Sequence, residues 1–462
     1  MMTTSVLLLT LLAGAGNVLA QGQGIEVDWQ SDDSVKAAAR LIAGDTMKYY
    51  DGDTPGKAPG LLYKTPDPEL WWWAGGALFG TMIDYWRFTK DSTFNDSVKK
   101  AMVHQAGVNQ DFLTPNWTAH MGNDDQGFWG MSAMLAAENN FDNPPPNEPQ
   151  WLATAQGVFN TMASPKRYDE VCGGGLRWQL SLYSKGYNYK NSISNGIMFN
   201  LGARLARYTG NKTYEEWAIK TWDWERKVGL ITDQYAVFDG ANDADDCANI
   251  NKDEWTYNSG VFLQGAAFLY NHTDGSALWR ERVEGLLDHM LAKFFPNKIA
   301  VETICQNDEQ SVCDRDPLIF KGVVHRWLAT VAQVAPFTRE KISPVLLESA
   351  RGAVSQCTGG ENGRQCGFQW STGKFDGKTN VGTEMSTLSA VVAVLSSRQL
   401  TAVPVTEKTG GTSKADPNAG GGEGATTPVM SVITTASKVA ASFLTLVVVL
   451  GIIGIQVWMI LD

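Results

Sequence analysis

The chain has 462 residues and a formal net charge of −11 at pH 7, with 38 Lys and Arg against 49 Asp and Glu. This acidic balance argues against a nucleic-acid partner, which would require a basic surface. The six cysteines are an even set, typical of disulfides in an exported protein. No CxxC or HExxH pattern occurs and histidines number only five, so the sequence predicts neither a metal site nor another cofactor.

Residues 1–20 are predicted to be a secretory signal peptide. Residues 5–13 are apolar over a length too short for a membrane span, and Val18, Leu19 and Ala20 form a small-residue cleavage pattern. We expect the mature protein to begin near Gln21.

One domain is predicted over residues 21–400, because no low-complexity break interrupts this part of the chain. In it, a small or amide residue repeatedly introduces an apolar, aromatic helix. Six such starts lie at residues 73–80, 126–131, 195–201, 258–263, 321–327 and 382–388. Amphipathic partner helices are predicted at residues 34–41, 151–162, 214–227 and 276–293. Six helical hairpins predict an all-α, (α/α)6 toroidal barrel with an axial cleft, although the periodicity is also compatible with an open solenoid.

Three consecutive tryptophans, Trp71, Trp72 and Trp73, precede the first inner helix. Flat aromatic rings stack on sugar faces, but three neighbours on a helix do not all face one cleft. We expect Trp72, together with Trp129 of the second inner helix, to contact a ligand.

Asp124 and Asp125 stand side by side at the start of the second inner helix. Retaining glycosidases need an ionised carboxylate as nucleophile and a protonated carboxyl as acid/base about 5 Å apart, and neighbouring residues at a helix start could supply both. The alternative is that the two aspartates only cap the helix, because side-chain oxygens there accept hydrogen bonds from free backbone N–H groups.

Four glycosylation sequons begin at Asn95, Asn116, Asn211 and Asn271, and would place those segments on the surface. Pairing Cys305 with Cys313 and Cys357 with Cys366 would close short loops and leave Cys172 for Cys247. Spacing alone does not establish this connectivity.

The C-terminal part of the chain predicts an anchor signal. Residues 401–430 form a linker rich in Gly, Thr and Ser, and residues 440–461 are almost wholly apolar. A transmembrane helix is the alternative, but no basic residue follows the apolar stretch, and small residues from Gly424 precede a polar spacer. We therefore expect a GPI anchor attached at Gly424, with Asn418 and residues 420–422 as other candidates, and removal of residues 431–462.

The run from Gly122 to Gly127, the run from Thr256 to Gly260 and the six hairpins together resemble glycoside hydrolase family 76, the endo-α-1,6-mannanases, over most of residues 25–400. The anchored layout resembles the fungal cell-wall branch of that family. The resemblance implies an (α/α)6 barrel, retention of anomeric configuration, Asp124 as nucleophile and Asp125 as acid/base. Ser259 stands where the family often has Gln, so we assign that position no role.

These roles agree with elementary electrostatics. An ionised Asp124 and apolar neighbours such as Phe128 and Trp129 would raise the pKa of Asp125. Once Asp124 is esterified its charge disappears, the pKa of Asp125 falls, and Asp125 can act as a base.

Other polar residues are candidate sugar contacts. Asn123, Gln126, Tyr257 and Asn258 could donate to sugar hydroxyls, or they could simply bond the backbone at helix starts. Asp239, in a loop after a helix, could hold a second mannose through two hydroxyls.

The sequence is compatible with three functions. The protein could transfer the GPI-core glycan of surface glycoproteins to a cell-wall glucan acceptor, hydrolyse α-1,6-mannosyl oligosaccharides, or bind mannan without catalysis. Anchoring through GPI at the plasma membrane or cell wall favours transfer, because the enzyme would meet GPI-linked donors there. Both reactions share one covalent intermediate and differ in the nucleophile that resolves it.

Overall fold

The computed structural model describes residues 24–62, 70–114, 120–306, 313, 315–399, 401–421, 438 and 442–452. The chain divides into two units, Met1–Ala425 and Thr426–Asp462. The predicted signal peptide and Gly424 lie outside the described residues.

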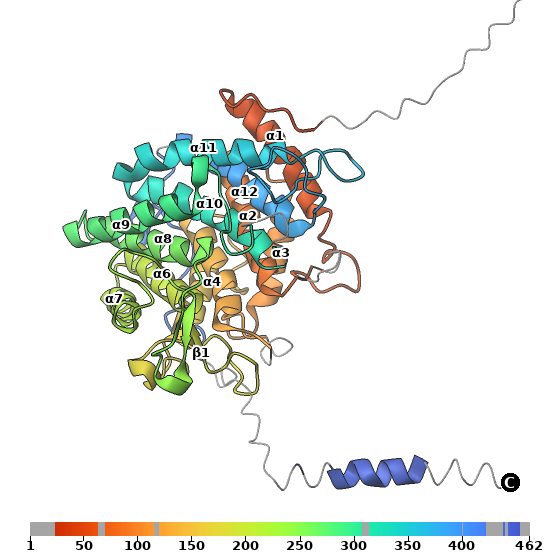
Figure 1. Ribbon diagram of the computed structural model, residues 1–462, viewed down its shortest axis with the longest axis vertical. Helices are drawn as coiled ribbons and strands as arrows, with labels where there is room; N and C mark the ends of the chain where they lie inside the picture. The colour runs from red at the N-terminus through yellow and green to blue at the C-terminus, as the bar shows by residue number, and fades with distance from the viewer. Residues whose placement is uncertain are drawn as a thin grey trace, which may run out of the picture. The chain divides into compact units, whose positions relative to one another are not determined.

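Twelve α-helices of the first unit, counted over its described residues, alternate between outer and inner positions (Figure 1). The inner helices are α2 (Trp73–Thr89), α4 (Asn123–Glu138), α6 (Ser192–Thr209), α8 (Thr256–His272), α10 (Pro317–Val334) and α12 (Val381–Arg398). The outer helices are α1 (Asp32–Met47), α3 (Asn95–Ala106), α5 (Trp151–Met162), α7 (Lys212–Val228), α9 (Ala277–Phe294) and α11 (Arg339–Ser355). Short 3-10 helices are η1 (Val171–Gly173), η2 (Asp243–Asp245), η3 (Pro296–Lys298), η4 (Pro336–Thr338) and η5 (Glu407–Thr409).

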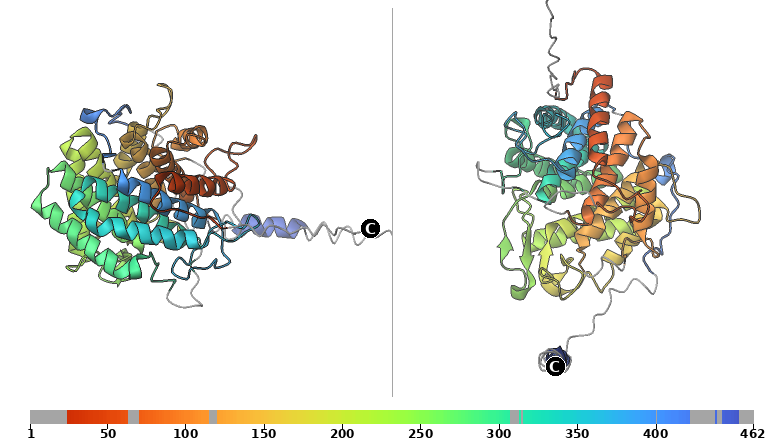
Figure 2. Two further views of the ribbon diagram at one scale, coloured as in Figure 1. Left: turned by 90° about the horizontal axis from the view of Figure 1, so that it is seen from above. Right: turned by 90° about the vertical axis from the view of Figure 1, so that its right-hand side faces the viewer.

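The inner helices form a closed ring. Each packs on the next in chain order, and α12 packs back on α2 (Figure 2). This closure confirms the predicted (α/α)6 barrel and excludes the open solenoid. All six inner starts lie in helices, whereas outer helices α3 and α11 were not predicted. Helix α11 carries Pro344 in its interior, a residue that normally interrupts a helix.

Close contact between inner helices depends on small residues. A Cβ atom on Gly76 of α2 would lie 2.9 Å from the indole of Trp129 on α4, closer than van der Waals contact allows. The glycine therefore lets a large ring fill the space between the two helices, and Trp129 is fully buried.

Inner helices α2, α4, α6, α8 and α10 each pack on the outer helix that follows in the chain, and a longer connection leads from each outer helix to the next inner one. The inner helices therefore all begin at the same end of the barrel. We call this the cleft end. A three-stranded antiparallel sheet stands there in the order β1-β2-β3, formed by β1 (Tyr189–Asn191), β2 (Gly240–Asn242) and β3 (Ile250–Asn251). Its register pairs Asn191 with Gly240, directly before α6 begins.

All three predicted disulfides are confirmed: Cys172–Cys247, Cys305–Cys313 and Cys357–Cys366. The first joins the α5–α6 connection to the connection between β2 and β3. It therefore ties together two loops of the cleft end.

Residues 401–421 correct the prediction of a linker that begins at residue 401. Val405 N–H donates to the carbonyl oxygen of Glu138 over 2.8 Å, and Gly420 N–H donates to that of Asn109 over 2.9 Å. Ala402, Val403 and Val405 pack against the core, and the more polar stretch that follows hydrogen-bonds along the barrel. The ordered unit thus continues about 20 residues beyond the predicted boundary.

The sequons occupy different environments. Asn211 is exposed and caps α7, and Asn95 is the half-buried first residue of α3. Asn271 lies in α8, where its amide nitrogen donates to the carbonyl oxygen of Val334. Asn116 lies outside the described residues.

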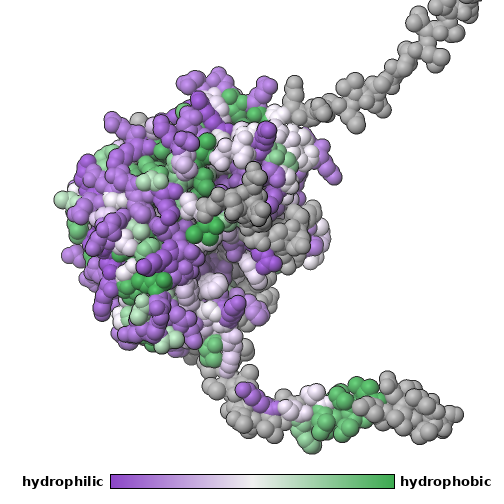
Figure 3. Space-filling view, viewed as in Figure 1, coloured by the Kyte–Doolittle hydropathy of each residue, from purple (hydrophilic) through white to green (hydrophobic). Residues whose placement is uncertain are grey.

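In the second unit, residues 442–452 are helical and carry exposed apolar side chains, including Phe443 and Leu450 (Figure 3). No helix within the described ranges is both long and apolar enough to cross a membrane.

Candidate active site

A cavity of about 630 Å³ lies at the cleft end, among the first turns of the inner helices and the loops that precede them. Its lining combines aromatic rings with carboxylates. The lining residues are Trp71, Trp73, His120, Asp124, Asp125, Phe128, Trp178, Gln179, Lys185, Tyr189, Asn191, Asp239, Trp255, Tyr257, Asp316, Pro317 and Phe320.

The two adjacent aspartates line the cavity on the first turn of α4. Oδ2 of Asp125 accepts from Gly122 N–H over 2.6 Å, and Oδ1 of Asp124 accepts from Asp125 N–H over 2.9 Å. A Cβ atom on Gly122 would lie 2.1 Å from Oδ1 of Asp124, so only glycine lets the backbone approach this closely. The pair therefore caps the helix and also presents carboxyl oxygens to the cavity.

Asn191, the residue before α6, reaches the first of these carboxylates. Its Nδ2 donates to Oδ2 of Asp124 over 3.1 Å. The pairing of β1 with β2 holds Asn191 in place. The sequence did not identify this residue, because nothing local relates it to an aspartate 67 positions earlier.

Replacing Asn191 with alanine is expected to lower kcat/KM about tenfold to a hundredfold, the effect of losing one hydrogen bond to a charged group. Donation by Asn191 lowers the pKa of Asp124, so its loss should raise that pKa. The acidic limb of the pH–rate profile should then move to higher pH. An unmoved acidic limb would contradict a positioning role.

The cavity raises the pKa of both aspartates. Burial is the main cause at Asp124, where the hydrogen bond from Asn191 and the backbone N–H of Asp125 act in the opposite direction. At Asp125 burial is again the main cause, and the negative charge of Asp124 raises the pKa further. One proton shared unequally by the pair therefore belongs on Asp125, which leaves Asp124 ionised.

Asp316, directly before α10, is a third carboxylate near the pair that the sequence did not identify. Nε1 of Trp73 donates to its Oδ1 over 2.8 Å. Its negative charge raises the pKa of both Asp124 and Asp125.

Asp316→Asn should keep an acceptor for Trp73 but remove this charge. Without the repulsion, the pKa of Asp124 and that of Asp125 should both fall. Both limbs of the pH–rate profile should move to lower pH, which rate measurements across the pH range would test. Limbs that stay in place, or move upward, would show that Asp316 does not act on the pair through its charge.

Aromatic rings form the walls of the cavity. Tyr257 of α8 stacks on Phe320 of α10, with ring centroids 3.8 Å apart and planes at 7°. Trp255 meets the edge of Phe320, and Trp73 packs on Phe128 at 4.5 Å. Rigid, partly apolar walls of this kind suit the faces of sugar rings.

Asp239 lies opposite the first turn of α8. Its Oδ2 accepts from the Tyr189 hydroxyl over 2.7 Å, and its Oδ1 accepts from Nδ2 of Asn258 over 3.3 Å. Asp239 and Tyr257 thus line the cavity, as their predicted roles require. Asn258 is fully buried and does not line it, so the structure replaces its predicted sugar contact with support of Asp239.

The structure corrects the two predicted tryptophans. Trp72 and Trp129 stack on each other in the core with centroids 5.2 Å apart, and neither lines the cavity. Nε1 of Trp72 donates to Gln105 on the outer helix α3. Its neighbours Trp71 and Trp73 line the cavity instead.

Asn123 and Gln126 are also corrected, because both are buried and bonded to protein groups. Nδ2 of Asn123 donates to the carbonyl oxygen of Arg177, and Nε2 of Gln126 donates to that of Asp111. Arg167 donates to the amide oxygens of both residues. These amides hold the start of α4 in place, which is the alternative that the sequence left open.

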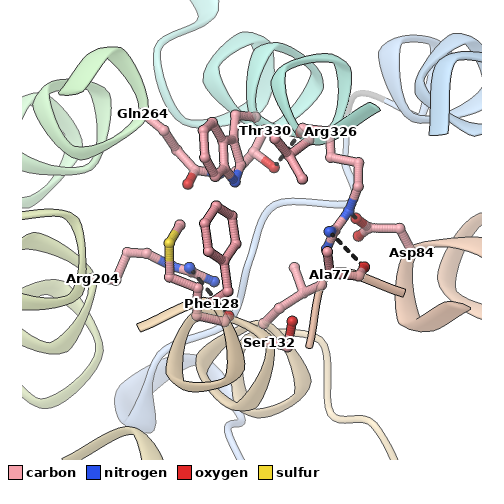
Figure 4. A pocket seen from close by; sticks show the side chains of 12 residues that line it. Ala77, Asp84, Phe128, Ser132, Arg204, Gln264, Arg326 and Thr330 are labelled. Atoms are coloured by element: carbon pink, nitrogen blue, oxygen red, sulfur yellow. Dashed lines mark hydrogen bonds and ion pairs between the residues drawn. The ribbon is translucent and has the colours of Figure 1, made fainter. Parts of the chain in front are cut away.

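Phe128 closes the cavity on its inner side and stacks on Trp327, with centroids 6.3 Å apart. Behind it lies a much smaller polar cavity of about 20 Å³. There Arg326 lies against Asp84 at 2.5 Å, while Arg204 stands on the other side of Phe128 (Figure 4). The two adjacent aspartates are thus backed by aromatic rings and then by paired charges.

Comparison with known proteins gives a consistent result. The family model described as Glycosyl hydrolase family 76 matches residues 34–408. The chain is 43% identical over 441 residues to the mannan endo-1,6-α-mannosidase DCW1 of Saccharomyces cerevisiae, with 94% of this chain and 95% of that protein covered.

Solved structures of similar proteins agree with this family match. Dfg5 from Chaetomium thermophilum, solved in complex with glucosamine, has a TM-score of 0.82 and 46% identity, with 86% of this chain and 98% of that chain covered. An inactive variant of an α-1,6-mannanase from Salegentibacter, solved with α-1,6-mannotriose, has a TM-score of 0.62 and 18% identity, covering 80% and 99% of the two chains. The second likeness supports the barrel fold.

Proposed function

The chain belongs to glycosyl hydrolase family 76, and from this premise we propose that it is a retaining transglycosidase that passes the GPI-core glycan of surface glycoproteins to a cell-wall glucan. Its action as a glycosidase on α-1,6-mannosyl linkages agrees with its relatives, which are named mannan endo-1,6-α-mannosidases. The retaining mechanism and the transfer step are the parts that go beyond those names.

The observation that carries the proposal is the unequal pair of carboxyls in one cavity. Asp124 accepts hydrogen bonds that favour its ionised form, whereas Asp125 faces the charge of Asp124. The α-1,6-mannanase variant solved as inactive has two consecutive aspartates replaced by asparagine. Both facts support catalysis by Asp124 and Asp125.

In the first step, Asp124 attacks the anomeric carbon while Asp125 donates its proton to the leaving glycosidic oxygen. The Asp124 ester has no charge, so the pKa of Asp125 falls and the carboxylate can accept a proton. In the second step, Asp125 takes the proton of an incoming hydroxyl, whose oxygen attacks the anomeric carbon and releases Asp124. Two inversions give net retention.

The charge of the cavity and one relative both support the proposed donor class. Asp239 and Asp316 add carboxylates to the cavity lining, and Dfg5 from Chaetomium thermophilum was solved with glucosamine, a cationic sugar at neutral pH. A GPI core joins mannose to a glucosamine with a free amine. Carboxylates can pair with that ammonium group, which a neutral mannan lacks.

Hydrolysis of mannan is the second candidate, favoured by the names of the curated relatives. It requires the same ester and differs only in the acceptor, which is water. Non-catalytic binding of mannan is the least favoured reading, because both carboxyls are present and line the cavity.

Mass spectrometry of the reaction products distinguishes glycan transfer, hydrolysis and non-catalytic binding. The protein is incubated in ¹⁸O-labelled water with a GPI-core oligosaccharide, with and without a β-glucan oligosaccharide. We expect an unlabelled donor–acceptor adduct. A labelled, shortened donor as the main product in the presence of glucan would replace transfer with hydrolysis, and binding without any product would reject catalysis.

The proposed location is the cell surface, with a GPI anchor at the plasma membrane or cell wall. Such a location would bring the enzyme to GPI-linked donors and to wall glucan. Phospholipase release of the protein from intact cells would test the anchor.

A further inference from the structure

Residues 401–421 follow a defined path along the outside of the barrel, and we call this segment the strap. It begins at the end of the barrel opposite the cleft. There Val405 N–H donates to the carbonyl oxygen of Glu138, the last residue of α4. Arg207, near the end of α6, donates to the carbonyl oxygen of Pro404 over 2.8 Å.

The strap then runs parallel to α5, from the first turn of that helix to its last. Leu152 N–H donates to Oγ of Ser413 over 2.9 Å, and Asp416 N–H donates to Oε1 of Gln156 over 2.8 Å. Nδ2 of Asn160 donates to the carbonyl oxygens of Pro417 and Ala419, both over 2.9 Å. Because α5 is an outer helix, its last turn lies at the cleft end.

The strap ends level with the catalytic pair. Gly420 N–H donates to the carbonyl oxygen of Asn109, and Gly420 lies against Thr161 in the last turn of α5. Thr161 in turn accepts from Nε2 of Gln126, the residue after Asp125. The chain therefore leaves the barrel at the cleft end, although its last inner helix, α12, finishes at the opposite end.

A second feature marks the same end. Several large apolar side chains in its loops are exposed without lining the cavity: Val108, Val171, Leu182, Tyr183 and Ile304. Val108 is 98% exposed and directly precedes Asn109, where the strap ends. At the opposite end, Leu278 on α9 is an exposed apolar residue of the same kind.

We propose that the strap turns the cleft end toward the membrane that holds the anchor, and that the exposed apolar loops of this end rest on the lipid surface. Aliphatic side chains with a tyrosine suit the interface between headgroups and acyl chains. This inference rests on the proposed function only for the presence of an anchor.

The geometry has a consequence for the donor. An anchor at Gly424 would follow the end of the strap by three residues, which span at most about 10 Å. The cavity would then stand close to the lipid surface, within reach of glycans attached to lipids of the same leaflet. A long wall polymer would have to enter from the side.

Förster resonance energy transfer between the protein and the lipid surface tests the orientation. All six cysteines are paired in disulfides, so Val108→Cys introduces a single thiol for a donor dye, and Leu278→Cys is its matched control on the opposite end. The anchored full-length product of a secretory host is placed in phosphatidylcholine vesicles with headgroup-labelled acceptor lipids. Inner helices of 16–18 residues separate the two ends by about 25 Å.

We expect energy transfer from a dye at position 108 to the labelled lipids to be at least twice as efficient as energy transfer from a dye at position 278. Equal transfer, or stronger transfer at position 278, would overturn the proposal. Inserting a helical spacer of about 20 residues after Gly421 moves the barrel roughly 30 Å away and should reduce transfer at position 108.

Two companion measurements separate this inference from the proposed function. Both labelled variants are assayed on a soluble α-1,6-mannosyl oligosaccharide. Strong energy transfer at position 108 in a protein that does not act on this oligosaccharide would support the orientation and reject the assignment as an enzyme. Failure of the full chain to float with vesicles would reject the anchor and the orientation together. Weak energy transfer at position 108, together with loss of binding to insoluble β-glucan in Leu182→Ser, would show that the apolar loops bind polysaccharide rather than lipid.

Discussion

Asp124→Ala is expected to lower kcat/KM on an α-1,6-mannosyl donor by at least about a thousandfold, because the proposed mechanism passes through a covalent ester at this carboxylate. The barrel should remain folded, since the side chain faces the cavity and its removal relieves repulsion with Asp125. Initial rates and circular dichroism would check the two parts. Rates near those of the unaltered protein would reject Asp124 as the nucleophile.

Azide can separate the roles of the two aspartates. In Asp124→Ala, azide fills the space of the carboxylate and attacks the α-linked donor directly, which gives a β-mannosyl azide. In Asp125→Ala, a donor with a good leaving group still forms the Asp124 ester, and azide then resolves it with retention. The opposite pattern of products would exchange the two assignments.

A matched substitution controls for the loss of negative charge. Asp274 is exposed in the turn between α8 and α9, at the end of the barrel away from the cavity. Asp274→Asn should leave kcat/KM unchanged within about twofold, because long-range effects between exposed charges are screened at physiological salt.

The largest effect on stability is expected at Arg204. Its guanidinium donates to Glu138 through Nε and Nη2, the latter over 2.6 Å, and both side chains are almost fully buried. Arg204→Met would leave Glu138 as an unpaired buried charge and should reduce the free energy of unfolding by about 3–5 kcal/mol. Chemical denaturation would measure this change.

A double substitution tests the cause. In Arg204→Met with Glu138→Leu no charge remains unpaired, so most of the lost stability should return. Arg351→Met removes one partner of the exposed pair with Glu348 and should cost less than about 1 kcal/mol. A double variant as unstable as Arg204→Met would show that packing, rather than the unpaired charge, controls stability there.

Much of this architecture could be predicted from local sequence. Amide and glycine residues before apolar runs identified all six inner helices, because a helix start requires small or capping residues close by. Two cysteine pairs were predictable because they close loops of fewer than ten residues, and the third followed from them. Asp124 and Asp125 stood out because their proximity is set by the peptide bond itself.

The choice of cavity residues depended on tertiary structure. Inner helices are buried on nearly every side, so their sequences carry no polar stripe to distinguish the face toward the cavity from the face toward the core. Trp72 and Trp73 are neighbours with the same side chain, yet one packs on Trp129 and the other lines the cavity. Only the direction in which each Cα–Cβ bond points in the closed ring separates them.

The same reason applies to the groups that shift the pKa values of the two adjacent aspartates. Asn191 and Asp316 come from different hairpins, and only closure of the ring brings them to the first turn of α4. The path of the strap likewise depends on hydrogen bonds to α5, most of which use the backbone of the strap and therefore leave no pattern in its sequence. The sequence by itself therefore determined the helices, the disulfides and the paired aspartates, whereas contacts between distant hairpins decided which side chains face the cavity and where the chain leaves the barrel.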